Sequence, residues 1–132
     1  MPEVKMASGR YEIEKTPAGE YAFSLFSTGG RLIAVGGNYK TLALAKKGIA
    51  SLRINSGADV FDSTQNDEIV PKCPRVEIYR IEGEYGGYNF AVVAKNGNVI
   101  ARGEGYGTKN RCAEAVANLR YIAFSAETSV KA

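Results

Sequence analysis

The sequence predicts a single α+β domain in which two tandem copies of one unit share a sheet. A chain of 132 residues is long enough for one domain and short for two independent ones. Residues 10–62 and 75–132 match each other in order, with 63–74 as the linker between them. Each copy contains three short alternating segments followed by one with helical spacing, an order typical of three strands and a helix.

The repeat is defined by two offsets along the chain. An offset of 65 residues places Arg10 on Arg75, and an offset of 67 places Phe23 on Phe90, after two extra residues in the 84–87 region. Further matches at the second offset hold turn and core positions in order: Gly30 with Gly97, Ile33 with Ile100, Gly36 with Gly103, Tyr39 with Tyr106, Thr41 with Thr108, and Leu52 with Leu119. One unit alone has little core and open sheet edges, so we expect the copies to complete each other.

The strands are predicted from alternation and from the turns between them. Two-residue hairpin turns with positive φ are expected at Gly29-Gly30 and Asn96-Gly97. The expected strands are 11–15, 21–27 and 32–35 in the first copy, and 76–80, 88–94 and 99–102 in the second. Their buried faces are predicted to carry Tyr11, Ile13, Tyr21, Phe23 and Leu25, and Val76, Ile78, Tyr88, Phe90 and Val92.

A helix is predicted after the third strand of each copy. Thr41 and Thr108 are the expected N-caps, because a Thr hydroxyl can accept a free N–H of the first turn. The expected buried residues are Ala45, Ile49 and Leu52 in one helix, and Cys112, Val116 and Leu119 in the other. Gly57 is a predicted terminator, and fourth strands are expected at 58–62 and 128–131.

Three segments of the chain resemble the YegP-like family of small uncharacterised proteins. Lys95-Asn-Gly-Asn-Val-Ile-Ala101 and Gly103-Glu-Gly-Tyr-Gly-Thr-Lys109 resemble the family's "NG-x-x-I … SEGY-x-SK" stretch, and Gly48-Ile-Ala-Ser-Leu-Arg53 resembles its "GI-x-SV" helix end. The resemblance implies two β3-α-β motifs in one antiparallel sheet, with helices on one face and the last strands exchanged between motifs. A fused pair of this kind is expected to be a monomer, an internal pseudo-dimer. The family implies no activity and no cofactor.

The composition excludes several classes of chemistry. There is no His, which removes His-based nucleophilic catalysis and most zinc sites. Of the two cysteines, Cys112 is expected in the core and Cys73 as an inert thiol of the linker. No catalytic, metal or cofactor site is therefore predicted, and the chain is not expected to be an enzyme. With no long apolar run, we expect a soluble cytoplasmic protein.

Two short motifs invite a ligand and are better explained as structure. Gly103–Lys109 precedes a helix, as phosphate loops do, yet it lacks the spacing of a P-loop, so turn and capping geometry is the preferred interpretation and anion binding stays open. Asp59–Asp62 with Asp67 and Glu68 lacks the ligand pattern of an EF-hand.

Two partner classes remain as hypotheses. The first is a protein partner bound on the outer sheet face, where Phe26, Tyr79 and Val93 are predicted to form an apolar strip. The alternative is weak electrostatic binding of nucleic acid by cations near the helices: Lys40, Lys46, Lys47, Lys109 and Arg111. The net charge of +3 is spread over both copies, and no membrane partner is expected. Tyr39 and Tyr106 are expected either as packing anchors or as ligand contacts.

Overall fold

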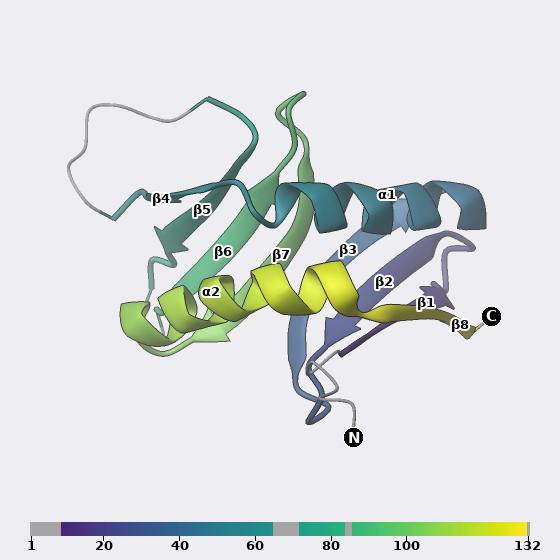
Figure 1. The fold of residues 1–132 in the computed structure, drawn as a ribbon, viewed down its shortest axis with the longest axis horizontal. Helices are drawn as coiled ribbons and strands as arrows, with labels where there is room; N and C mark the ends of the chain where they lie inside the picture. Colours follow the sequence, from purple (N-terminus) through teal and green to yellow (C-terminus); the bar gives the residue numbers. More distant parts are fainter. Residues whose placement is uncertain (1–8, 65–71, 84–85, 132) are drawn as a thin grey trace, which may run out of the picture.

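The chain forms one eight-stranded sheet and two helices in the computed structural model, which describes residues 9–64, 72–83 and 86–131 (Figure 1). Residues 65–71 of the expected linker, with Asp67 and Glu68, lie outside the described residues. The first unit contains β1 (Arg10–Lys15), β2 (Tyr21–Phe26), β3 (Leu32–Tyr39), α1 (Leu42–Asn55) and β4 (Asp59–Asp62). The second contains β5 (Arg75–Arg80), β6 (Tyr88–Val93), β7 (Val99–Tyr106), α2 (Lys109–Ser125) and β8 (Glu127–Lys131).

The strand order shows that each unit gives its last strand to the other. The order is β4-β5-β6-β7-β3-β2-β1-β8, so β4 lies beside β5 and β8 lies beside β1. The six inner strands are antiparallel, but both outer pairs are parallel, so the expected antiparallel sheet is in fact mixed. Parallel neighbours need a connection of about a dozen residues, which the 63–74 segment supplies between β4 and β5.

The registers repeat on the two sides of the sheet centre. Ile13 pairs with Phe23 in one unit, and their counterparts Ile78 and Phe90 pair in the other. The two units meet where β3 and β7 pair at Val35 and Arg102. These two positions correspond in the repeat, so an internal pseudo-two-fold axis passes close to them.

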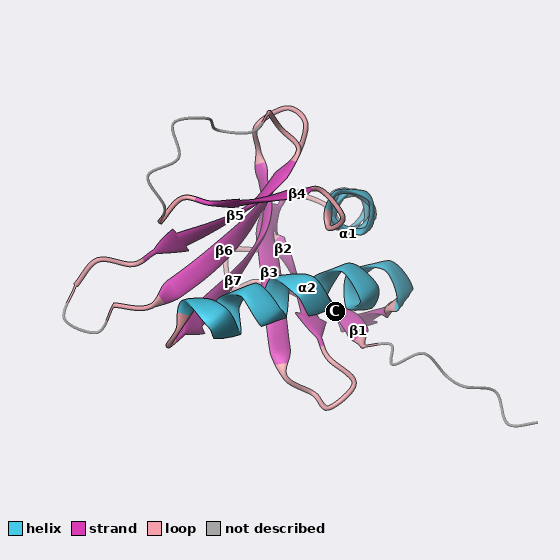
Figure 2. Cartoon of the chain, turned by 60° about the vertical axis from the view of Figure 1, so that its left-hand side comes forward, coloured by secondary structure: helices cyan, strands magenta, loops and turns pink. Residues whose placement is uncertain are grey.

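The core lies between the sheet and the two helices. Both helices lie in front of the sheet in Figure 1, and the rotated view in Figure 2 shows α2 running across several strands. One cluster of buried residues joins both units: Tyr11, Ile13, Phe23, Leu25, Ala45, Ile49, Leu52, Val76, Ile78, Phe90, Val92, Cys112, Val116 and Leu119. The predicted buried faces of the helices and of the first two strands in each unit are thereby confirmed, with Tyr21 and Tyr88 partly buried against the cluster.

The third strands extend further than predicted, because glycine allows an aromatic ring to cover the strand. A Cβ on Gly36 would lie 2.5 Å from the ring of Phe23, and a Cβ on Gly103 would lie 2.0 Å from the ring of Phe90. The Gly-rich run that was expected as a loop before the helix is therefore mostly strand, since β7 ends at Tyr106. Gly107 alone lies between the end of β7 and the N-cap Thr108. The Thr108 side chain accepts a hydrogen bond from the backbone N–H of Arg111, as predicted.

The turns differ from the prediction in two ways. At both hairpins the φ angle is positive at Gly30 and Gly97 only, and the flanking hydrogen bond joins residues four apart, as from the N–H of Ala94 to the carbonyl of Asn98. These are three-residue loops ending in a left-handed glycine, not two-residue turns. At the end of α1, Ser56 is the C-cap in right-handed geometry, so Gly57 does not act as a left-handed terminator.

Candidate functional site

The outer face of the sheet, opposite the helices, does not bring the three predicted apolar residues together. Phe26 and Tyr79 lie at the same level along their strands, but β2 and β5 are four strand positions apart in the sheet. The distance between the two residues is therefore about 19 Å. Val93 lies at the other end of the strands, in the row that contains Val99, and only 6% of its surface is exposed. Arg10 covers Phe26, with its guanidinium 4.6 Å from the ring centre. The expected continuous strip is thus a set of separated residues.

Charged residues on the flanking outer strands neutralise one another. Glu12 on β1 binds Lys131 of β8 and lies 3.7 Å from Arg10. The hydrogen bond from Lys131 holds the pKa of the Glu12 carboxyl below its ordinary value, and the charge of Arg10 acts in the same direction. In the other unit, Nε of Arg75 lies 3.1 Å from Oε1 of Glu77. These groups are therefore engaged within the sheet.

Sequence reasoning missed exposed apolar residues on the two central strands: Val35 lies at the centre of the outer face, while Leu32 and Val99 lie three residues away toward opposite ends of these strands. Leu32, Val35 and Val99 lie on β3 and β7 and are 52%, 37% and 45% exposed. Arg102 pairs with Val35 across the two strands, is exposed, and forms no ion pair with any residue that the structure describes. Leu32 pairs with Phe26 and Val99 pairs with Val93 beyond the bulges in β3 and β7, and each also lines a cleft beside a helix, Leu32 at α2 and Val99 at α1.

The predicted cations near the helices are divided between different places. Lys40 and Lys47 line one cleft. Arg111 lines a different cleft, which is the first cleft's counterpart under the pseudo-two-fold symmetry. Nζ of Lys109 lies 3.0 Å from Asp62 and 3.2 Å from the Thr64 hydroxyl. Lys46 is exposed on α1 and lines neither cleft.

The first cleft, which we call the basic cleft, lies between the two units. Its walls are the end of β3, one side of α1 and the β6–β7 hairpin of the other unit, and it encloses about 560 Å³. Lys40 and Lys47 are its charged residues, and none of the described carboxylates lines it. The other polar lining groups include Asn38, Asn96, Asn98 and Ser51.

The second cleft, which we call the mixed cleft, is the counterpart of the basic cleft under the repeat. It encloses about 1040 Å³ between the end of β7, α2 and the β2–β3 hairpin. Glu114 stands at the position of Lys47, and Gly107 lies at that of Lys40. Arg31 and Arg111 are balanced there by Glu104 and Glu114, so the mixed cleft has no excess of either charge.

Tyr39 and Tyr106 are packing anchors beside these clefts. Tyr39 stacks on Phe23 and Tyr106 stacks on Phe90, with ring centres 6.0 Å apart in both pairs. Burial raises the pKa of both tyrosines. A Cβ at position 48 would lie 2.2 Å from the Tyr39 hydroxyl, so Gly48 makes room for it. Since Ala115 replaces this glycine in the second unit, the two clefts cannot have identical walls.

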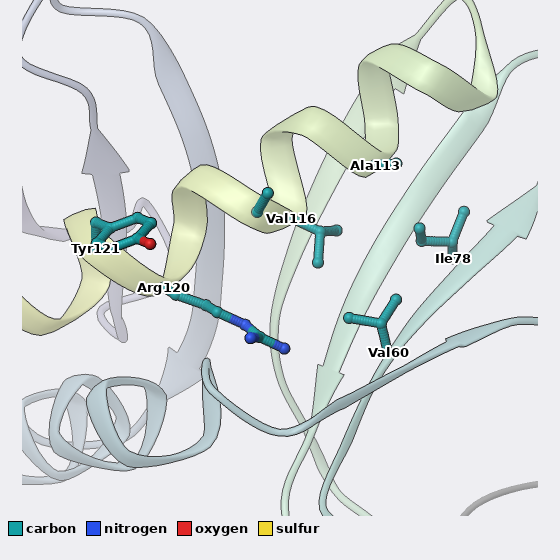
Figure 3. Close-up of a pocket in the computed structure, with 7 residues that line it drawn as sticks. Val60, Ile78, Ala113, Val116, Arg120 and Tyr121 are labelled. Atoms are coloured by element: carbon teal, nitrogen blue, oxygen red, sulfur yellow. The ribbon is translucent and has the colours of Figure 1, made fainter.

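A third depression, an apolar groove, lies between α2 and the strands β4 and β5. It encloses about 340 Å³ and is lined by Val60, Ile78, Ala113, Val116, Ala117, Arg120 and Tyr121. Figure 3 shows Arg120 extending from α2 toward β4, where its Nη2 donates to the carbonyl of Ala58 at 3.3 Å.

The counterpart of Arg120 makes a much denser set of contacts in the first unit. Arg53 donates to the carbonyls of Ala123, Phe124 and Ala126 at the end of α2. Its guanidinium also lies 4.8 Å from the ring centre of Tyr11. In the second unit Val76 takes the position of Tyr11, so Arg120 has no ring beneath it. The apolar groove is therefore a place where the two units pack differently.

The cysteines do not form a reactive site. Cys112 is fully buried, and burial raises the pKa of its thiol to about 11, so it is protonated at neutral pH. Cys73 is half-buried, with its sulfur 3.2 Å from Nη1 of Arg75. Within the described ranges, no group of three or more Cys, Asp or Glu side chains is arranged to hold a metal ion.

Comparisons with known proteins agree with the repeat and the fold. The model of a domain of unknown function, DUF1508, matches twice, at residues 17–62 and 84–129. The UPF0339 protein YegP of Yersinia pestis is 32% identical over 94 residues, which cover 70% of this chain and 84% of that protein. The UPF0339 protein plu2779 of Photorhabdus laumondii is 33% identical over 101 residues, covering 76% and 75% of the two chains.

Two solved structures share the architecture. The NMR structure of yegP from E. coli, a protein of unknown function, has a TM-score of 0.71 at 21% identity, covering 96% of this chain and 95% of that one. The NMR structure of the UPF0339 protein SO3888 from Shewanella oneidensis has a TM-score of 0.71 at 17% identity, covering 93% and 91%. Neither helix in the described part of the chain has the length and apolarity needed to span a membrane.

Proposed function

This chain belongs to the YegP-like family and contains two tandem DUF1508 domains. The family supplies a fold but no activity, so we propose a function from the surface of this chain. We propose that it is a non-catalytic module that binds a protein partner at the centre of its outer sheet face. Val35, which is 37% exposed and pairs with Arg102 at the centre of this face, supports this proposal, and Leu32 and Val99 add exposed apolar surface toward either end of the same two strands. The predicted residues Phe26 and Tyr79 lie at the margin of this surface.

The chemistry of this surface favours a protein over a nucleic acid. Its apolar side chains can be buried against apolar side chains of a partner, and Arg102 can pair with a carboxylate. Glu12 and Glu77 on the same face would repel phosphates, and their cationic neighbours are already engaged. The partner is therefore a protein segment that presents apolar residues with an Asp or Glu among them.

Site-specific photo-crosslinking in the cells that produce the protein tests this proposal. A photo-reactive amino acid at position 35 should capture a partner, and the same amino acid at position 54 should not, although Ile54 is more exposed than Val35, because Ile54 lies on α1. Arg102→Glu should weaken the capture about tenfold or more, by replacing attraction with repulsion. Capture of the same proteins from both positions, or capture indifferent to Arg102→Glu, would eliminate the outer face as the binding surface.

Electrostatic binding of nucleic acid is a second candidate, supported by Lys40, Lys46 and Lys47 at the start of α1. None of these lysines forms an ion pair with a described residue. Since Lys109 is held by Asp62 and Arg111 lies in the mixed cleft, three of the five predicted cations share one side. A gel-shift titration should therefore give a slope of log affinity against log salt of about −3 at most. Absence of a shift at low salt would remove this candidate.

A further inference from the structure

We propose that the basic cleft is a binding site for a small phosphorylated molecule. This goes beyond the proposed function, because the cleft is formed by α1, the end of β3 and the β6–β7 hairpin; it shares Val99 with the surface proposed above but does not include Val35 or Arg102. It also requires both units, since the hairpin belongs to one and the helix to the other. A single unit would have only part of the walls.

The charge of the cleft specifies an anion. Lys40 and Lys47 line it, and among the residues that the structure describes no carboxylate lines it or lies within ion-pair distance of either lysine. Two ammonium groups beside one cavity repel each other, and an anion between them removes that repulsion. Lysine ammonium groups are compact point charges that bind phosphate, as in phosphate-binding loops, and the higher charge of a phosphate gains more from two of them than a single carboxylate does.

Neutral donors around the lysines provide the remaining recognition. Asn38, Asn96 and Asn98 carry side-chain amides that can donate or accept hydrogen bonds. Oδ1 of Asn96 accepts from the N–H of Asn98 at 3.0 Å, which fixes the amide and leaves its NH₂ group free to donate. The volume of about 560 Å³ lies in the range of small-molecule sites, about 300–1,000 Å³.

The mixed cleft shows which of these residues are specific to the site. The shared packing residues Tyr39 and Tyr106 are retained in both clefts, so the repeat preserves the cavity itself. The polar lining is different: Lys40 corresponds to Gly107, Lys47 to Glu114, Asn38 to Gly105, Asn96 to Gly29, and Asn98 to Arg31. One cleft therefore carries an anion site, and its larger counterpart is an internal control built from the corresponding elements.

The test is a titration of the ¹⁵N-labelled protein with inorganic phosphate and pyrophosphate at constant ionic strength, followed by NMR. Saturable shifts are expected at 38–40, 47–48 and 96–99, with little change at the counterparts 105–107, 114–115 and 29–32. Equal shifts in both clefts, or shifts that never saturate, would overturn the proposal, since they indicate general ionic effects. Acetate, a carboxylate, is titrated in the same way. If the shifts with acetate saturate at the same concentration as those with phosphate, the preference for phosphate is refuted.

Variants separate the cleft from general charge and from the outer face. Lys40→Gln with Lys47→Gln should weaken phosphate binding about tenfold or more. Lys46→Gln also removes one positive charge from α1 but lies outside the cleft, so binding should be retained. Lys40→Gly with Lys47→Glu gives the two charged positions of the basic cleft the residues of the mixed cleft and should abolish saturable binding. Arg102→Glu should leave the titration unchanged, so this proposal and the outer-face proposal fail independently.

Discussion

A single methyl group added at Gly103 should destabilise the protein strongly, because this glycine lies directly under the ring of Phe90. A Cβ there would be 2.0 Å from Cε2 and 2.3 Å from Cζ of Phe90, and 2.7 Å from the carbonyl oxygen of Ile33. The ring cannot move aside easily, since Phe90 is fully buried and stacks on Tyr106. The Ile33 carbonyl belongs to β3, so the clash also acts on the junction between the two units.

The expected loss is at the upper end of the range for an overpacked core. Insertion of extra carbon atoms into a well-packed interior costs about 1–3 kcal/mol, and here both a ring and a backbone atom must shift, so we expect about 3 kcal/mol for Gly103→Ala. For a domain of this length that corresponds to a melting temperature lower by about 10 °C. The counterpart Gly36→Ala should behave similarly, because its Cβ would lie 2.5 Å from both Phe23 and the Ile100 carbonyl.

Urea unfolding followed by circular dichroism measures this loss. Gly107→Ala is the matched control, since a Cβ there meets nothing within 4 Å, and it should change the free energy of unfolding little. Combining Gly103→Ala with Phe90→Leu should cost less than the sum of the single changes, because a smaller side chain relieves the clash. If Gly103→Ala unfolds at the same urea concentration as Gly107→Ala, the packing argument is wrong.

Three further predictions concern the two arginines Arg53 and Arg120, the carboxyl of Glu12, and the two cysteines. Arg53→Gln should lower the free energy of unfolding by about 2 kcal/mol, because several carbonyls lose a charged donor. Arg120→Gln should lower it by only about a few tenths of a kcal/mol, and the urea midpoints of the two variants measure the difference. The pKa of Glu12 is lowered in the folded state, so its contribution to stability is present at neutral pH and is lost as the pH falls through the range in which carboxyl groups titrate. Glu12→Gln should therefore reduce the loss of stability at acid pH in a profile of unfolding free energy against pH, and an unchanged acid limb would contradict this. A thiol reagent should modify Cys73 but not Cys112 in the native protein, and both in denaturant; rapid native modification of Cys112 would show that its helix opens.

The repeat made most of the fold predictable from the sequence. Two copies gave the same order of elements, and both N-caps and both buried helix faces were identified correctly from residue type and spacing. The ends of β3 and β7 were not, because a glycine inside a strand has the same local signal as one in a loop. Only the tertiary contact with Phe23 or Phe90 explains Gly36 and Gly103, and that contact is invisible to local reasoning.

The surfaces were less predictable than the core, for a related reason. Alternation placed Val93 correctly on the outer face but could not show that it is buried there. Spacing alone also could not assign Lys40 and Lys47 to one cleft and Arg111 to another, because each cleft combines a helix of one unit with a hairpin of the other. The sequence signal that was available is the comparison between copies, in which Lys47 aligns with Glu114.

Fusion of the two units explains how a symmetric fold can carry an asymmetric surface. In a dimer of identical units, a residue that improves one cleft appears in both, and a charge near the two-fold axis meets its own copy. In the fused chain Val35 faces Arg102 across the axis, an arrangement that identical units cannot form. Matched positions that stay identical, such as Phe23 with Phe90 and Gly36 with Gly103, hold the fold, while those that differ include the charged positions of the clefts and the pair at the centre of the outer face. Binding should therefore depend on the residues by which the two copies differ.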